Sequence, residues 1–150
     1  MTMQSAGLLV YRTAGDGVEI FLVHPGGPFF AKKDDGAWSI PKGVFDDEDP
    51  LTAARREFVE ETGFKIAGDF FELKPVKQKG GKIVRAWAVE ADVDADAIQS
   101  NTFTMEWPPK SGKTAEFPEV DRAAWFDPET AKQKINPAQS AFITELLSRI

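Results

Sequence analysis

Runs of apolar residues near the start of the chain predict a pair of β-strands. Residues 5–12 and 18–24 are rich in β-forming side chains, and the turn-prone segment 13–17 separates them. The two runs are therefore expected to pair as antiparallel strands. Residues 25–37 are predicted to form a loop, and residues 38–40 a short strand that ends at a proline.

The apolar spacing becomes helical in the next part of the chain. Asp49 is a favoured N-cap, Pro50 suits the first helical turn, and Gly63 suits the position after the last turn. A helix is therefore predicted between Asp49 and Gly63. Its apolar positions recur at helical spacing and are expected to face the core: Leu51, Ala54, Phe58 and Val59.

The second half of the chain predicts four further strands and two helices. The strands are expected at 70–78, 82–90, 103–107 and 123–127, and the helices at 128–134 and from about Pro137 onward. Gly80 and Gly81 suit a hairpin turn between the first two of these strands. A proline-rich loop is expected between the last two. Strands interleaved with helices predict one domain, residues 1–150, of mixed α/β or α+β class.

Composition excludes several kinds of chemistry. The 150 residues contain no Cys and one His, so disulfides, thiolate zinc sites and multi-histidine metal sites are ruled out. That residue, His24, is expected to be a buried polar or turn-capping group. Any metal site must use oxygen ligands, which favours Mg²⁺, Mn²⁺ or Ca²⁺. The net charge of −6 argues against DNA as a partner.

The first residues show no basic region ahead of an apolar stretch, and no apolar run approaches the roughly 20 residues of a membrane helix. A cytoplasmic location without a membrane partner is therefore expected. The oligomeric state stays open.

The charge is concentrated in one segment. Residues 43–64 carry seven acids and two arginines, a local charge of −5. On a helix, Glu57 and Glu61 share a face, and Glu60 lies on the flank of the same arc. Such carboxylates repel one another unless a cation lies among them. The alternative is a solvated acidic helix face that arginines stabilise.

The segment 56–64, R-E-F-V-E-E-T-G-F, resembles the core of the Nudix box, R-E-U-x-E-E-x-G-U with U apolar. Glu48 stands eight residues before Arg56, as the leading Glu of that family does. Gly43 follows Pro41 and Lys42, another feature of the family. Four residues separate Gly43 from Glu48, whereas the family usually has five.

The resemblance implies a Nudix-type α/β/α sandwich with a mixed sheet and the box helix on one side. It also implies hydrolysis of a diphosphate linkage with Mg²⁺, or Mn²⁺, as cofactor. Glu57 and Glu61 would be the core metal ligands, with Glu60 in or near the ligand shell and the Gly43 carbonyl as a further ligand. Catalytic roles would fall to Glu60, Arg56 and Glu48, with Arg56 paired to Glu48 or to a catalytic Glu.

Many members of that family carry a further carboxylate six positions before a late Trp. Glu119 has this spacing from Trp125 and is the candidate general base or extra metal ligand. Glu116, in the same loop, is the second candidate. The resemblance fixes neither the identity of the base nor the number of metal ions.

The substrate is expected to be a small nucleoside diphosphate derivative. Residues 74–85 carry a local charge of +5, which suits binding of a polyphosphate. The predicted phosphate-binding residues are Lys42, Lys77, Lys79, Lys82 and Arg85. Aromatic side chains are weaker candidates for stacking on a base: Tyr11, Phe30 and Trp87.

Residues 5–12 and 24–43, with the late Trp, look like bacterial Nudix proteins related to diadenosine polyphosphate hydrolases, so a dinucleoside polyphosphate is the favoured substrate. Nucleoside triphosphates or nucleotide sugars are alternatives. The short segment after Gly43 keeps open a nucleotide-binding regulator without catalysis, and a protein-interaction role for the scaffold is a third possibility.

Overall fold

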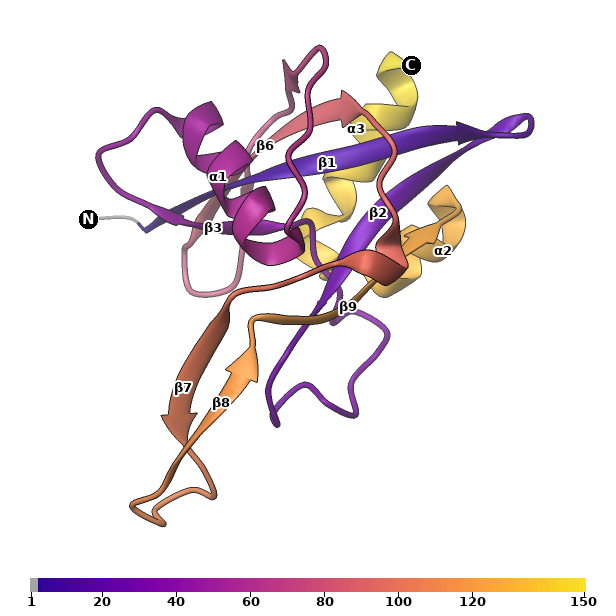
Figure 1. The fold of residues 1–150 in the computed structure, drawn as a ribbon. Helices are drawn as coiled ribbons and strands as arrows, with labels where there is room; N and C mark the ends of the chain where they lie inside the picture. The colour runs from indigo at the N-terminus through magenta and orange to yellow at the C-terminus, as the bar shows by residue number, and fades with distance from the viewer. Residues whose placement is uncertain (1–2) are drawn as a thin grey trace.

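A mixed β-sheet separates two helical layers in the computed structural model, which describes residues 3–150 (Figure 1). The strand order is β4-β6-β1-β2-β9, while β3 pairs with β1 and β5 pairs with β6. β1 and β6 run parallel, and the other pairs are antiparallel. The strands of this sheet are β1 (Gln4–Ala14), β2 (Gly17–Pro25), β3 (Lys42–Phe45), β4 (Phe71–Glu72), β5 (Val76–Lys77), β6 (Ile83–Glu90) and β9 (Val120–Phe126).

Helix α1 (Pro50–Thr62) covers one face of the sheet, and α2 (Pro128–Lys134) and α3 (Ser140–Arg149) cover the other. Because successive strand residues point to opposite faces, β1 supplies both layers. Leu9 packs in the cluster that contains Phe142 of α3, whereas Leu8 packs in the cluster that contains Phe58 of α1. The predicted α/β/α sandwich with the box helix on one side is confirmed.

The local signals of α1 act as predicted. The Asp49 carboxylate accepts a hydrogen bond of 3.0 Å from the backbone N–H of Thr52, and Gly63 ends the helix at φ = 80°. The expected apolar face is partly wrong, because Val59 is exposed. The helix geometry explains this, since Phe58 points into the sheet and the next residue, Val59, is turned about 100° away from it.

The predicted strand at 38–40 is wrong. Trp38 and Ser39 form only isolated bridges, to Ile135 and Val23. The extended segment that joins the sheet comes after Pro41, as β3. This strand pairs with the start of β1 and thereby places Gly43 beside Ala6.

The predicted proline-rich loop contains a strand that was not expected. β8 (Thr114–Pro118) pairs with β7 (Thr102–Glu106) as a separate two-stranded sheet. We call residues 102–118 the arm. Figure 1 shows the arm projecting from the body of the molecule, with its base near the start of β9.

The remaining elements follow the prediction more closely. The first antiparallel pair, the helix at 128–134 and the terminal helix are confirmed, although the short 3-10 helices η1 (Ala95–Ala97) and η2 (Pro137–Gln139) were not expected. The predicted strand 70–78 is divided into β4 and β5, which both pair with β6. Within residues 3–150, no helix has the length and apolarity that crossing a membrane requires.

Candidate metal and phosphate site

The pairing of β3 with β1 brings the backbone of Gly43 against a carboxylate of α1. A Cβ atom on Gly43 would lie 2.0 Å from Cδ of Glu57 and 2.1 Å from its Oε2. Only glycine therefore leaves room for the Glu57 carboxylate at this place. One residue earlier, the backbone N–H of Lys42 donates a hydrogen bond of 3.2 Å to Oε1 of Glu61. Glu57 and Glu61 thus both contact the backbone of β3.

Burial makes this pair of carboxylates electrostatically unusual. Burial raises the pKa of Glu61 to about 8, and the negative charges of Glu57 and Glu119 act in the same direction. Burial is also the main cause of the raised pKa of Glu57, followed by the charge of Glu60. The lowered pKa of the Lys42 ammonium has the same main cause. A bound cation would favour the ionised form of both carboxyl groups.

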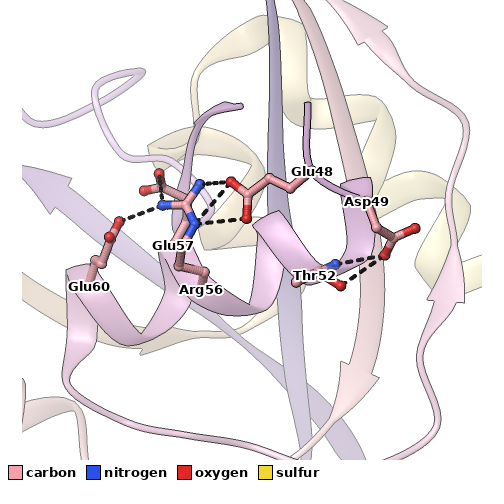
Figure 2. A network of polar contacts seen from close by, with 6 residues as sticks. All are labelled: Glu48, Asp49, Thr52, Arg56, Glu57 and Glu60. Carbon is pink, nitrogen blue, oxygen red and sulfur yellow. Dashed lines mark hydrogen bonds and ion pairs between the residues drawn. The ribbon is translucent and has the colours of Figure 1, made fainter. Parts of the chain in front are cut away.

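Arg56 holds three acidic side chains around one guanidinium (Figure 2). Its Nε donates to both carboxylate oxygens of Glu48, at 3.0 and 3.1 Å, and its Nη2 also bonds to Glu48. Its Nη1 donates to Oε1 of Glu57 and to Oε2 of Glu60, each at 3.0 Å. The Arg56 guanidinium lowers the pKa of Glu48. The resemblance implied a pairing of Arg56 with Glu48 or with a catalytic Glu, and the structure shows Arg56 bonded to Glu48 and also to Glu57 and Glu60.

Glu119 reaches the box helix through a relay of backbone hydrogen bonds. The N–H of Asn101 donates to the carbonyl of Glu60 at 2.8 Å, and the N–H of Glu119 donates to the carbonyl of Asn101 at 2.8 Å. The N–H of Gly26 then donates to the carbonyl of Glu119 at 2.9 Å. A Cβ on Gly26 would lie 2.0 Å from the carbonyl oxygen of Pro118, so these segments are in close contact.

A small cavity of about 130 Å³ lies where these segments meet. Its lining includes Lys42, Glu61 and Glu119. Burial and the charge of Glu60 raise the pKa of Glu119, which places this carboxyl group in the field of the box carboxylates. The alternative candidate, Glu116, is exposed on β8 of the arm.

The donor set fits a hard divalent cation. The residues that could hold such a cation all offer oxygen atoms: the carboxylates of Glu57, Glu60, Glu61 and Glu119 and the carbonyl of Gly43. Within residues 3–150, no three acidic side chains already converge in a coordinating arrangement. The reason is visible in Figure 2, where Glu57 and Glu60 turn toward Arg56.

The predicted phosphate-binding residues are distributed unevenly around this centre. Lys82 lies close enough to Lys42 for its charge to lower the Lys42 pKa. Lys77 and Lys82 line an open cavity of about 600 Å³ beside the turn that carries Lys79. Arg85 instead forms an ion pair of 2.8 Å with Glu72, so its guanidinium already has a partner.

The three aromatic candidates for stacking on a base differ in how exposed their rings are. Trp87 is only 7% exposed and packs in the core beneath α1, which leaves no free ring face for a base. Tyr11 is half-buried and packs against the core on the other face of the sheet. Phe30 is 38% exposed, and its neighbour Phe29 is 58% exposed.

Two residues that join the segments around the site could not be identified from their side chains in the sequence. Asn101 and Gly26 act through backbone groups, and only the Gly26-Gly27 pair hinted at a special turn. The expectation for His24 is confirmed. It is fully buried, with Nδ1 2.8 Å from Oδ1 of Asp121 and Nε2 2.7 Å from the carbonyl of Lys33, and so ties the 26–37 segment to β9.

Comparison with known proteins assigns the chain to a family. The NUDIX domain family model matches residues 1–146. An RNA pyrophosphohydrolase of Agrobacterium fabrum is 32% identical in an alignment of 127 residues that covers 74% of this chain and 69% of that protein. The chain therefore belongs to the NUDIX family. It is a hydrolase of phosphoanhydride bonds, from a family that generally uses divalent metal ions.

Solved structures share the fold at low sequence identity. A C. elegans Ap4A hydrolase in a binary complex superposes with a TM-score of 0.68 at 21% identity, over 98% of this chain and 96% of that one. The NUDIX domain of Shewanella oneidensis NrtR, complexed with ADP ribose, gives a TM-score of 0.68 at 14% identity, over 99% and 88% of the two chains.

Proposed function

We propose that this protein is a Mg²⁺-dependent hydrolase of nucleoside diphosphates linked to another group, with a dinucleoside polyphosphate as its preferred substrate. The observation that carries the proposal is the placement of Glu57 and Glu61 against the backbone of β3, with Glu119 and Lys42 on the same cavity. The name of the C. elegans relative, an Ap4A hydrolase, supports the choice of substrate.

Glu57, Glu61 and the Gly43 carbonyl are the proposed metal ligands, with Glu60 at the edge of the set. When bound, the cation supplies positive charge to the phosphate oxygens and lowers the pKa of the attacking water. Mg²⁺ suits this set because it prefers oxygen donors and keeps some of its waters.

The protein groups supply binding, orientation and proton transfer. The Lys42 ammonium binds phosphate oxygens at the cavity, and Arg56 fixes the orientation of the carboxylates of Glu57 and Glu60. Glu119 accepts the proton of the water as its oxygen attacks phosphorus, while the bridging P–O bond breaks and its electrons leave with the departing phosphate. Glu60 is the alternative base.

Hydrolysis assays test this function directly. The purified protein is incubated with diadenosine tetraphosphate, ATP, ADP-ribose and a 5′-triphosphorylated RNA oligonucleotide, with Mg²⁺, with Mn²⁺ or with EDTA. Products are identified by mass spectrometry in ¹⁸O-water. We expect metal-dependent cleavage, fastest with the dinucleotide, and loss of turnover in Glu61→Gln. Turnover of Glu61→Gln equal to the parent would refute the metal assignment.

The same panel separates the competing functions. Faster cleavage of the RNA oligonucleotide than of the dinucleotide would favour the activity named for the Agrobacterium fabrum relative. Tight nucleotide binding by calorimetry without any turnover would favour a regulator. A metal-independent melting temperature together with no nucleotide binding would favour a protein-interaction role.

A further inference from the structure

The arm and the 26–37 segment form one continuous aromatic surface. A Cβ on Gly27 would lie 2.9 Å from Cζ of Phe103, so the segment packs directly on β7. The rings of Phe29 and Trp107 meet edge to face, with centroids 5.7 Å apart. An isolated two-stranded hairpin is marginally stable, so these contacts add to the backbone hydrogen bonds at the base of the arm in holding it against the body.

The fold does not use the outer part of this surface. Phe29 and Phe30 are 58% and 38% exposed, although they are adjacent and large. Trp107 lies beside Phe29 and is itself only partly buried. Exposed apolar side chains that cluster, rather than scatter singly, are typical of a ligand-binding surface.

Both segments of this surface carry lysines, and one lysine lies against a ring. The segment 26–37 carries Lys32 and Lys33, and the tip of the arm carries Lys110 and Lys113. The Lys33 ammonium lies 5.3 Å from the centre of the Phe30 ring. In the described part of the chain, none of these four lysines forms a side-chain ion pair with an acid. Aromatic faces beside cations are the combination that binds a nucleobase and its phosphate.

The surface is continuous with the proposed metal site. The arm ends at Pro118, and the next residue, Glu119, lines the cavity that contains Lys42. The hydrogen bond from Gly26 to the Glu119 carbonyl joins the 26–37 segment to the same point. A polyphosphate that starts at the metal site can therefore extend onto the aromatic surface.

We propose that the arm and the 26–37 segment bind the nucleoside at the far end of the polyphosphate, so that they select dinucleoside polyphosphates over mononucleotides. The inference rests on the proposed function. Phe29 and Phe30 provide the stacking faces, and the Lys33 ammonium beside the Phe30 ring supplies positive charge next to the bound nucleoside.

The test compares two substrates that differ only in the second nucleoside: diadenosine tetraphosphate and adenosine 5′-tetraphosphate. Stacking contributes about 1–3 kcal/mol per base, which corresponds to about 5- to 150-fold. The double variant Phe29→Ala/Phe30→Ala should therefore lower kcat/KM for the dinucleotide by that factor, mainly through KM. The value for adenosine tetraphosphate should change less than twofold. Phe29→Trp/Phe30→Trp should restore the preference.

Ile150→Ala is the matched control, because it also removes an exposed apolar side chain, 51% exposed, far along the chain from the arm. It should leave both kcat/KM values unchanged. An equal loss with both substrates in the double alanine variant would indicate a structural role and overturn the proposal. Equal kcat/KM for the parent and this variant with the dinucleotide would overturn it as well.

Binding measurements separate this inference from the proposed function. A methylene-bridged analogue of each substrate is titrated by calorimetry in the presence of Mg²⁺. If the parent binds the dinucleotide analogue more tightly and the double alanine variant loses this preference, the result supports nucleoside binding by the arm, even if the parent hydrolyses neither substrate. Equal binding of the two analogues by the parent overturns the arm proposal even if hydrolysis is observed.

Discussion

Replacement of Gly43 by alanine tests the centre of the proposed site with a single methyl group. The added Cβ would lie 2.0–2.3 Å from the three carboxyl atoms of Glu57, whereas ordinary contact begins at 3.4 Å. The carboxylate must therefore retreat by about 1 Å or more. Because the far end of a side chain moves more easily than backbone, the fold should tolerate the change.

The displacement is large on the scale of metal coordination. Mg²⁺ requires oxygen ligands at about 2.0–2.1 Å in nearly ideal octahedral geometry. A misplacement of about 1 Å in a catalytic arrangement costs roughly 100-fold in rate. We therefore expect Gly43→Ala to lower kcat/KM by about 100-fold, with a loss of about 1 kcal/mol or less in the free energy of unfolding in EDTA.

Metal-linked stability provides an assay that does not depend on substrate. A cation at 100 times its Kd stabilises the parent by about 2.7 kcal/mol. If Gly43→Ala weakens binding 100-fold, the same concentration gives only about 0.4 kcal/mol. Thermal unfolding with and without Mg²⁺ measures this difference. Gly17→Ala is the control, since the nearest atom to its added Cβ is 3.9 Å away.

A second variant localises the effect to Glu57. On the Gly43→Ala background, Glu57→Asp withdraws the carboxylate by one methylene group and should recover part of the lost activity, so that the two changes are not additive. If Gly43→Ala kept the kcat/KM of the parent and its full stabilisation by Mg²⁺, the reasoning would be refuted, because the contact between Gly43 and Glu57 would then not belong to the metal site.

Three further substitutions probe the surrounding contacts. Gly26→Ala forces a methyl group against the Pro118 carbonyl. It should lower the free energy of unfolding in urea by about 1–3 kcal/mol and lower kcat at least tenfold. An unchanged kcat would count against the role of Glu119. Arg56→Ala removes the guanidinium that Glu48, Glu57 and Glu60 share, and in EDTA no metal ion offsets the repulsion among these carboxylates. The melting temperature should therefore fall more in EDTA than in Mg²⁺, and equal shifts in the two conditions would contradict this. Gln139→Leu leaves the buried N–H of Ile40 without its acceptor, so the free energy of unfolding in urea should fall by about 1–3 kcal/mol. An unchanged free energy of unfolding would contradict this.

Local signals made α1 predictable from the sequence. Its N-cap, its first-turn proline and its terminal glycine each act over a few residues, and the structure shows all three in place. The spacing of acids on this helix also predicted which carboxylates share a face. The sequence pattern placed Glu119 near a late Trp, and the structure brings it to the same cavity as Glu61.

Features that depend on distant partners were less predictable. β3 joins the sheet by pairing with the start of β1, and its four residues, with Gly43 among them, are too few to show a strand pattern. β8 was hidden by the prolines and lysines around it. Its alternation of half-buried Ala115 and Phe117 with exposed residues becomes meaningful only beside β7. The Asn101 relay uses peptide groups that every residue carries.

The position of Glu119 has a consequence for folding. The box carboxylates lie within α1, but Glu119 precedes β9, which joins the sheet only at the edge of β2. The parallel pairing of β1 with β6 likewise joins residues about 80 positions apart in the chain. Contacts of such long sequence separation form slowly. A folding intermediate with α1 docked but β9 undocked would have the proposed ligands on α1 but lack the proposed base Glu119, so catalytic competence should appear only with the last strand of the sheet.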